Sequence, residues 1–214
     1  MCVFWSAFSV FGLPEKQKTN PETRTPKYEL NMIIVRHATL DDLEAILQLQ
    51  EKYHVSNLTE AEKQTKGFVT MKVTHEQFNK LVSKNGVFIA VADTGELAAY
   101  ALTSDWAYYS QWAIIQQMAN LLADFSLENS AITTENSFQY GPICIDEAFR
   151  GQGILAQLFE AIQVVYAPHF AFAITFINKQ NERSMKAHAR QTPLSIVGDF
   201  KFNDNEYWVL AARI

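Results

Sequence analysis

The sequence predicts an α/β domain preceded by a short tail, on three observations. The chain has 214 residues, of which 48% are hydrophobic, and this suits one domain of ordinary size. Segments rich in Thr, Val, Ile and aromatic residues, typical of strands, alternate with segments rich in Ala, Leu, Gln and Glu, typical of helices. A glycine-rich turn joins an apolar strand to a helix within residues 143–159.

The composition argues against several other classes of protein. The formal net charge is −5 and no long basic run occurs, so we expect no nucleic-acid partner. Cys2 and Cys144 stand in very different contexts, which indicates no disulfide framework. No Cys/His cluster has zinc spacing, so we expect no metal. We therefore expect a cytoplasmic protein without a membrane partner.

The first 31 residues differ from the rest of the chain. Residues 1–13 are apolar and rich in Phe and Trp, whereas residues 15–31 are polar and follow Pro14. A signal peptide would need a basic start, which is missing, and the apolar part is too short to span a membrane. We expect a flexible extension outside the core, with residues 32–214 as the domain and Met32 as an alternative start. An extra helix packed on the domain or on a second subunit is the other interpretation.

The first elements of the domain follow in order. Ile33–Arg36 is an apolar run that predicts a strand. Thr39 precedes two acidic residues and apolar positions at helical spacing, so it should cap a helix. A second, short helix should begin near Leu58–Glu62, and residues 67–73 should be extended.

The next elements show hairpin and capping signals. Thr74 and Gln77 form a capping box that should open a third helix. Two strands, at residues 87–92 and 96–103, should form a hairpin across Asp93–Gly95. The remaining expected elements are a helical stretch at 114–125 inside an insertion spanning 104–136, a strand at 138–145, a helix from 154, a strand at 170–177, and strands at 194–202 and 207–212 paired across 203–205.

The turn at Arg150–Gly153 should bind an anion. It lies between a strand and a helix that starts at Ile154, and the first N–H groups of a helix have no partner within it. The helix dipole is positive at that end, and Gly151 and Gly153 leave no side chain in the way. A phosphate or pyrophosphate is the expected ligand, and a plain tight turn is the alternative.

Two common phosphate motifs are absent from this turn. A dinucleotide-binding fingerprint needs a third glycine where the chain has Ala156. A Walker loop needs Gly-Lys followed by Ser or Thr, which does not occur.

The turn resembles the pyrophosphate loop of the GNAT acetyltransferase superfamily, through Arg150-x-x-Gly153 before a helix. A second motif of that family, an apolar strand followed by an Asn, is matched by residues 170–177 and Asn181, with Ser184 and position 188 at the expected offsets. The resemblance covers about residues 32–214 and is strongest from 140 to 190. It departs at Leu155, where the family has a small residue, and at His188, where the family has Tyr.

The resemblance implies a mixed, mostly antiparallel sheet flanked by helices, with two central parallel strands that splay apart. It also implies an acetyl-CoA-dependent N-acyltransferase without a metal, which uses acetyl-CoA as cosubstrate and a small-molecule or amino-acid-like amine as acceptor. A homodimer is compatible with it. The residues implied for acetyl-CoA binding are Ile143, Cys144, Ile145, Arg150, Gly151, Gln152, Gly153, Ile154, Leu155, Asn181 and Ser184.

His188 stands where the resemblance places the acid that protonates the leaving thiolate. An imidazole near its ordinary pKa can donate a proton at neutral pH, although packing on the helix is the alternative role. For the general base the sequence offers only candidates, namely Asp146, Glu147, Glu135 and Tyr140, with a water chain equally suitable. Cys144 lies in an apolar strand, which favours a buried structural thiol over a nucleophile.

Four aromatic residues in seven positions could form one wall of the acceptor pocket, or equally a packed helix face. They are Trp106, Tyr108, Tyr109 and Trp112. Two other functions remain open: a catalytically silent acyl-CoA-binding or regulatory module on the same fold, and a different enzyme or nucleotide-binding protein on an α/β scaffold.

Overall fold

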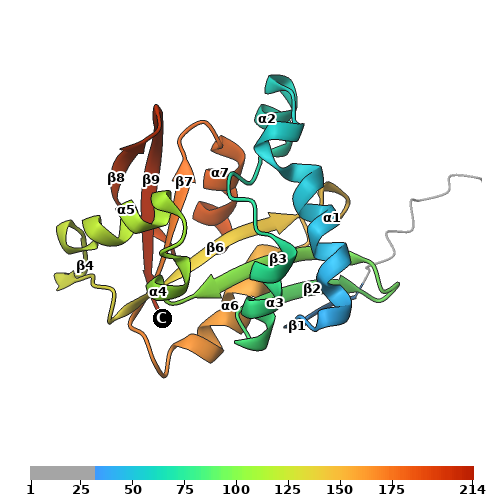
Figure 1. Ribbon diagram of the computed structural model, residues 1–214, viewed down its shortest axis with the longest axis horizontal. Helices are drawn as coiled ribbons and strands as arrows, with labels where there is room; N and C mark the ends of the chain where they lie inside the picture. The colour runs from blue at the N-terminus through green and yellow to red at the C-terminus, as the bar shows by residue number, and fades with distance from the viewer. Residues whose placement is uncertain (1–31) are drawn as a thin grey trace, which may run out of the picture. The chain divides into compact units, whose positions relative to one another are not determined.

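A computed structural model describes residues 32–214, and the expected extension at 1–31 lies outside the described residues. Its main feature is a seven-stranded sheet with strand order β1-β2-β3-β6-β7-β9-β8 (Figure 1). The β6–β7 pair is parallel and the other five neighbouring pairs are antiparallel. A mixed, mostly antiparallel sheet flanked by helices is thus confirmed.

The first half of the sheet is an antiparallel meander, and three helices lie in the chain between its first two strands. Its elements are β1 (Ile33–His37), α1 (Leu43–Tyr53), α2 (Glu60–Lys66), α3 (His75–Ser83), β2 (Val87–Ala92) and β3 (Leu97–Ser104). α3 begins at the predicted cap Thr74, and α2, expected near Leu58–Glu62, begins at Thr59. The side chains of Thr59 and Thr74 accept hydrogen bonds from the main-chain N–H groups of Glu62 and Gln77. At the predicted cap Thr39 a 3-10 turn, Leu40–Asp42, precedes α1.

The second half carries the parallel pair and the closing hairpin. Its elements are α4 (Trp106–Tyr109), α5 (Ala113–Leu121), β4 (Ser126–Leu127), β5 (Ser130–Ala131), β6 (Ser137–Ile145), α6 (Ile154–Tyr166), β7 (Phe172–Asn178), α7 (Glu182–Gln191), β8 (Ser195–Phe202) and β9 (Asn205–Arg213). The predicted strand at 170–177 begins two residues later than expected.

The insertion between β3 and β6 differs most from the prediction. The helix expected at 114–125 is the shorter α5, and α4 precedes it, opened by Asp105, whose Oδ1 accepts from the N–H of Tyr108 at 2.8 Å. The small β4–β5 hairpin was not predicted. Its turn places Glu128 and Asn129 at φ 52° and 62° without the glycine that usually signals such a turn.

Helices cover both faces of the sheet. On one face α1 and α3 pack over Tyr100 and Leu102 of β3, and on the other α6 packs over Ala99 and Ala101 (Figure 1). This follows from the alternation of side chains along a strand. α7 lies beside α6.

A bulge in β6 separates the two parallel strands. β6 and β7 pair only from Ser137↔Phe172 to Gln139↔Ile174. Immediately afterwards the register with β3 shifts, so that Gly141 and Pro142 together oppose a single β3 residue between Ala101 and Thr103. A bulge bends its strand, and Pro142 has no N–H to give to a neighbour. Beyond this point β6 pairs only with β3 and β7 only with β9, which is the expected splay.

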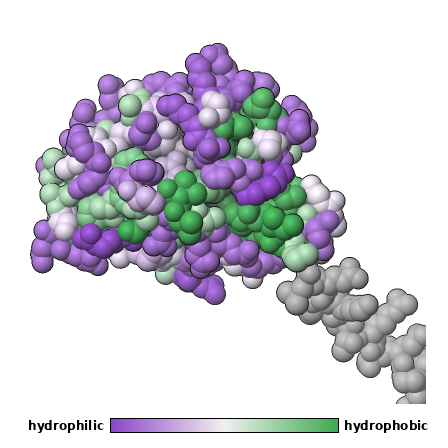
Figure 2. All heavy atoms as spheres, turned by 90° about the horizontal axis from the view of Figure 1, so that it is seen from below, coloured by the Kyte–Doolittle hydropathy of each residue, from purple (hydrophilic) through white to green (hydrophobic). Residues whose placement is uncertain are grey.

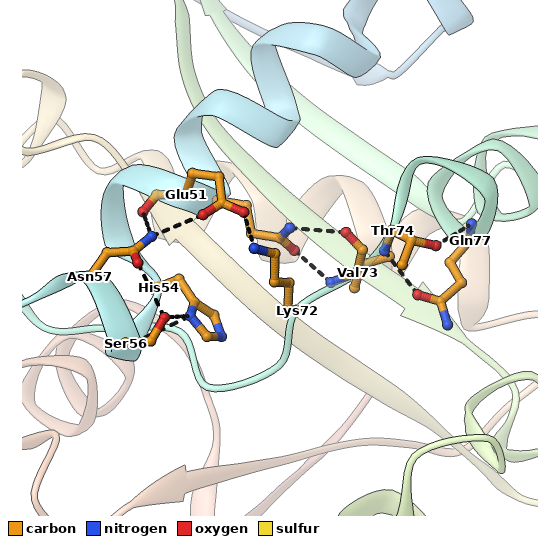
Figure 3. Close-up of polar contacts among 9 residues, drawn as sticks. Glu51, His54, Ser56, Asn57, Lys72, Val73, Thr74 and Gln77 are labelled. Atoms are coloured by element: carbon orange, nitrogen blue, oxygen red, sulfur yellow. Dashed lines mark hydrogen bonds and ion pairs between the residues drawn. The ribbon is translucent and has the colours of Figure 1, made fainter.

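A strap of irregular backbone, Gly67–Val73, connects α2 to α3. Gln50 of α1 holds it: its Nε2 donates to Val73 O at 2.9 Å, and its Oε1 accepts from Val73 N at 2.8 Å. Figure 3 shows the next residues, where Lys72 pairs with Glu51 and Thr74 exchanges hydrogen bonds with Gln77.

Apolar side chains also reach the surface. Figure 2 shows separate green areas among hydrophilic ones on the face seen from below. The exposed large apolar residues of the described chain are Met32, Ile34, Leu40, Val164, Val165 and Ile196. The homodimer that the sequence allows stays a prediction. Within residues 32–214 no helix combines the length and the apolar character needed to cross a membrane.

Replacing Gln50 by Leu should loosen the strap. Both main-chain groups of the fully buried Val73 would lose their partner, and each such loss costs about 1–3 kcal/mol. We expect Gln50→Leu to lower the free energy of unfolding by about 2–6 kcal/mol in urea denaturation. Gln48→Leu, at an exposed position of the same helix, is the matched control. Equal midpoints for the two variants would contradict this account of the strap.

Candidate functional site

A cavity of about 1110 Å³ opens where β6 and β7 part. Its lining combines the end of β6, the turn before α6, one face of α7 and the start of the strap. Ten of the eleven residues predicted to bind the coenzyme line it, and the eleventh, Gln152, is exposed beside it. Those ten are Ile143, Cys144, Ile145, Arg150, Gly151, Gly153, Ile154, Leu155, Asn181 and Ser184.

The turn presents free N–H groups to this cavity. Gly151 and Gly153 adopt φ values of 82° and 74°, which L side chains rarely adopt, and a Cβ at either would meet nothing within 4 Å. The first hydrogen bond of α6 runs from Gln157 N to Gly153 O, so the preceding N–H groups have no acceptor in the helix. No side chain caps α6 and no acidic residue lies in its first turn, in contrast to α2, α3 and α7.

Arg150 is held at the mouth of the cavity. Its Nε donates to Ile145 O at 3.1 Å, and its guanidinium lies 5.1 Å from the ring centre of Tyr53. The hydroxyl of Tyr53 accepts from Glu147 N at 2.8 Å, which fixes the 3-10 turn Glu147–Phe149 before the glycines. The remaining N–H groups of Arg150 are directed by this packing and suit a phosphate.

The charge of the cavity is opposite to that of the chain. Among its lining residues Glu182 is the single carboxylate, and five residues are cationic: Lys66, Arg150, Arg183, Lys186 and Arg190. The three from α7 stand three and four positions apart, so they share one helical face. This spacing of basic residues is visible in the sequence and could have predicted a second basic wall, whereas no sequence signal pointed to Tyr53.

Asn181 joins α7 to the strap. Its Oδ1 accepts from Ser184 N at 3.2 Å, so Asn181 caps α7. Its Nδ2 donates to Phe68 O at 2.9 Å. Both ends of the amide therefore have protein partners, which suits a role in ordering the site more than direct contact with a ligand.

His188 lies on the wall of the cavity with its side chain buried. Its Nδ1 is 2.8 Å from Ser184 O, and a carbonyl can only accept, so Nδ1 carries the proton. Nε2 is then the acceptor, and it has no partner among residues 32–214. Burial lowers the pKa of His188, which outweighs the opposite effect of the bond to Ser184. The lowered pKa favours the neutral ring at neutral pH, and the proton-donating role expected for His188 stays a prediction.

Comparison with known proteins finds matches by structure but none by sequence. No protein-family model matches the sequence, and no curated protein matches it. Solved structures match most of the chain. A GNAT-family acetyltransferase from Streptococcus agalactiae superposes with a TM-score of 0.59 at 11% identity, over 85% of this chain and 95% of that one. The chain has the GNAT fold.

Two further structures show the same likeness. An N-acetyltransferase from Staphylococcus aureus gives a TM-score of 0.55 at 18% identity and covers 85% of this chain and 98% of its own. YncA from Salmonella typhimurium, solved with its cofactor acetyl-CoA, gives a TM-score of 0.56 at 12% identity. The match covers 86% of this chain and 94% of that one.

The aromatic residues predicted to form an acceptor wall are packed elsewhere in this GNAT fold. Trp106 Nε1 donates to Ser137 O at 3.0 Å, Tyr109 OH to Gly141 O at 3.1 Å, and Tyr108 OH to Gln77 O at 2.8 Å. None of the three lines the cavity: Trp106 and Tyr109 are buried in the core, and the half-buried Tyr108 packs against it. Only Trp112 borders a cavity, a second one of about 440 Å³.

The candidate bases are largely engaged. Burial would raise the pKa of Asp146, but hydrogen bonds from Lys52 Nζ at 2.7 Å and from Ala148 N hold it below its usual range. Glu135 and Tyr140 do not line the cavity. Cys144 is buried as expected, with Sγ 3.9 Å from Leu49 O, and burial raises the pKa of its thiol. Within the described residues no group of three or more His, Cys, Asp or Glu could hold a metal ion.

The buried His188 should make stability depend on pH. Unfolded His188 binds a proton near its ordinary pKa of 6.5, whereas the folded ring has a lower pKa. The contribution of the neutral His188 ring to the free energy of unfolding is therefore fully present above pH 6.5. It is lost as the pH falls through the pKa of the folded state.

We expect the difference in unfolding free energy between the wild type and His188→Gln to shrink from pH 7.5 to pH 5.5, measured by urea denaturation at each pH. His75→Gln, at an exposed position of α3, controls for removal of a histidine. A difference that stays constant over this range would show that His188 is not buried as described.

Proposed function

We propose that the chain is an acyl-CoA-dependent N-acyltransferase that moves an acetyl group from acetyl-CoA to a primary amine of a small molecule or amino-acid-like acceptor. The observation that carries this proposal is the cationic cavity between the splayed strands, with the uncapped N-terminus of α6 at its mouth. Different residues of this cavity suit the phosphate end and the pantetheine end of acetyl-CoA.

The phosphate end has a defined receptor. The free N–H groups at Gly151–Leu155 and the guanidinium of Arg150 suit a pyrophosphate, since both donate to anionic oxygens. Lys66, Arg183 and Arg190 add positive charge along the same wall.

The pantetheine end has an open strand edge. Beyond Gln139 the side of β6 that faces β7 has no partner strand, so main-chain groups near Ile143–Ile145 can pair with the amides of a pantetheine arm. An N–H of the same strand could stabilise the oxyanion that forms during acyl transfer.

His188 is the residue we assign to proton transfer. The amine nitrogen forms a bond to the thioester carbon, the carbon–sulfur bond breaks, and the amine proton must reach the departing sulfur. Nε2 of His188 is buried, neutral and without a partner, so it can take that proton and then return it to the thiolate. It thereby acts first as base and then as acid, which removes the need for a protonated ring at the start.

A silent acyl-CoA-binding module is the second candidate. Two observations favour it: His188 stands where the family has Tyr, and Lys52 engages the carboxylate of Asp146 near the turn. Coenzyme binding without turnover of any amine would identify it.

Gly153→Asp should abolish binding of acetyl-CoA, because a carboxylate would face the phosphates at the start of α6. Gly95→Asp in the β2–β3 turn is a matched control: its φ is 86°, and a Cβ there also meets nothing within 4 Å. Isothermal titration of both variants and the wild type with acetyl-CoA checks this. Affinity within about twofold of wild type for Gly153→Asp would refute the loop assignment.

His188→Ala should lower kcat by about 100-fold and leave acetyl-CoA affinity nearly unchanged, because general acid–base groups contribute at least that much. In the wild type, kcat/KM should fall as the pH drops through the lowered pKa of His188, and this limb should vanish in the variant. Equal rates in both proteins would return His188 to a structural role.

A further inference from the structure

A second cavity of about 440 Å³ lies beside the first and shares only Phe68 with its lining. It is bordered by α2, the strap, the start of α5, the end of β7 and the β8–β9 turn. A cavity of this size is at the lower end of the range for small-molecule sites. Its apolar and aromatic lining residues are Val55, Phe68, Met71, Trp112, Ile114, Phe176, Phe202 and Tyr207.

The two cavities meet at the strap. Phe68 lines both of them, and its carbonyl is held by Asn181 at 2.9 Å. Its neighbour Val69 lines the first cavity and Thr70 the second. A ligand in the second cavity would therefore lie one side chain away from a cosubstrate in the first, at the opening between β6 and β7.

The wall of the second cavity suits a flat apolar group. Phe176 and Tyr207 meet edge to face with their ring centres 5.7 Å apart, and Phe202 and Trp112 come from other elements to the same cavity. Aromatic side chains on several sides favour an aromatic ligand through offset and edge-to-face contacts.

The charges at this cavity favour an anion over a second cation. Glu60 is the single carboxylate among its lining residues, and Lys63 already pairs with it at 2.6 Å. Lys72 lies on the rim, paired with the exposed Glu51 (Figure 3). The lining residues carry one net positive charge, from Lys63 and Lys72 against Glu60. This charge favours a ligand carboxylate, which would share the two ammonium groups with Glu60 and Glu51, over a polyamine.

We propose that the second cavity is the acceptor site and that the acceptor is an α-amino acid with an aromatic side chain. The ring occupies the aromatic wall, the carboxylate lies toward Lys63 and Lys72, and the α-amine points past Phe68 to the thioester. The products are the N-acetyl amino acid and free coenzyme A, whose thiol receives the amine proton. This inference rests on the proposed function, because only an acyl donor in the first cavity gives the amine a reaction partner.

The test compares acceptors on the purified full chain with acetyl-CoA, by following release of the free thiol. L-phenylalanine should have the highest kcat/KM, 2-phenylethylamine should be weaker because it lacks the carboxylate, and spermidine and L-lysine should be poorest. 3-Phenylpropionate, which has no amine, should bind in isothermal titration and inhibit in competition with phenylalanine. This binding can be measured without turnover.

Lys72→Gln provides the matched variant. It should reduce the preference for phenylalanine over phenylethylamine by about fivefold, the effect of an exposed ion pair worth about 1 kcal/mol. Acetyl-CoA affinity should not change. Lys80→Gln removes another surface lysine that pairs with a glutamate, Glu76, but lies outside both cavities, and should leave the preference unchanged.

The outcomes separate the two proposals. Acetyl-CoA binding with turnover of spermidine or lysine in preference to phenylalanine would overturn the acceptor assignment and leave the proposed function standing. Acetyl-CoA binding without binding of 3-phenylpropionate would also overturn it. Failure of a folded sample to bind acetyl-CoA would overturn the proposed function and, with it, this inference.

Discussion

The rest of the structure depends on the bulge at Gly141 and Pro142. It ends the parallel pairing of β6 with β7 after three residue pairs and leaves the edges of two central strands without neighbours. Main-chain N–H and C=O groups in the middle of a sheet normally satisfy one another, so an opened pair is stable only if something else meets those groups. The cavity, the glycine turn and α7 are all arranged around this opening.

The strap forms part of the cavity wall, through Gly67, Phe68 and Val69. Its main chain is fixed from three sides, by Gln50 at one end, by Tyr53 through Val69, and by Asn181 at Phe68. A segment without secondary structure of its own thus has a defined position, because helices on both faces of the sheet supply its partners. This is why one aromatic side chain, Phe68, can separate two cavities of different character.

Local motifs explain how much the sequence could predict. The caps Thr59, Thr74 and Asn181 and the turn Gly151–Gly153 act over a few residues, so their spacing already specifies their geometry. The splay came from resemblance, although Pro142 inside a predicted central strand was a direct signal for a bulge.

The aromatic cluster and His188 could not be assigned in the same way. Whether Trp106 and Tyr109 face a cavity or the core depends on carbonyls of Ser137 and Gly141, which lie more than thirty residues away along the chain. The protonation state of His188 depends on its burial and on which of its ring nitrogens meets Ser184 O. Residue spacing along the sequence predicts neither the direction of these aromatic side chains nor the protonation state of His188.

The contrast between the acidic chain and its cationic cavity affects how an anionic ligand approaches. The chain carries a formal net charge of −5, while five cationic residues and one carboxylate line the cavity. At physiological ionic strength the Debye length is about 8 Å, so an approaching polyphosphate senses the nearby cations and little of the distant acids. In dilute buffer the screening length grows to about 30 Å, and the whole acidic surface then repels the same molecule. Moderate salt would therefore favour encounter with this cavity, the reverse of the salt dependence of a uniformly basic phosphate-binding protein.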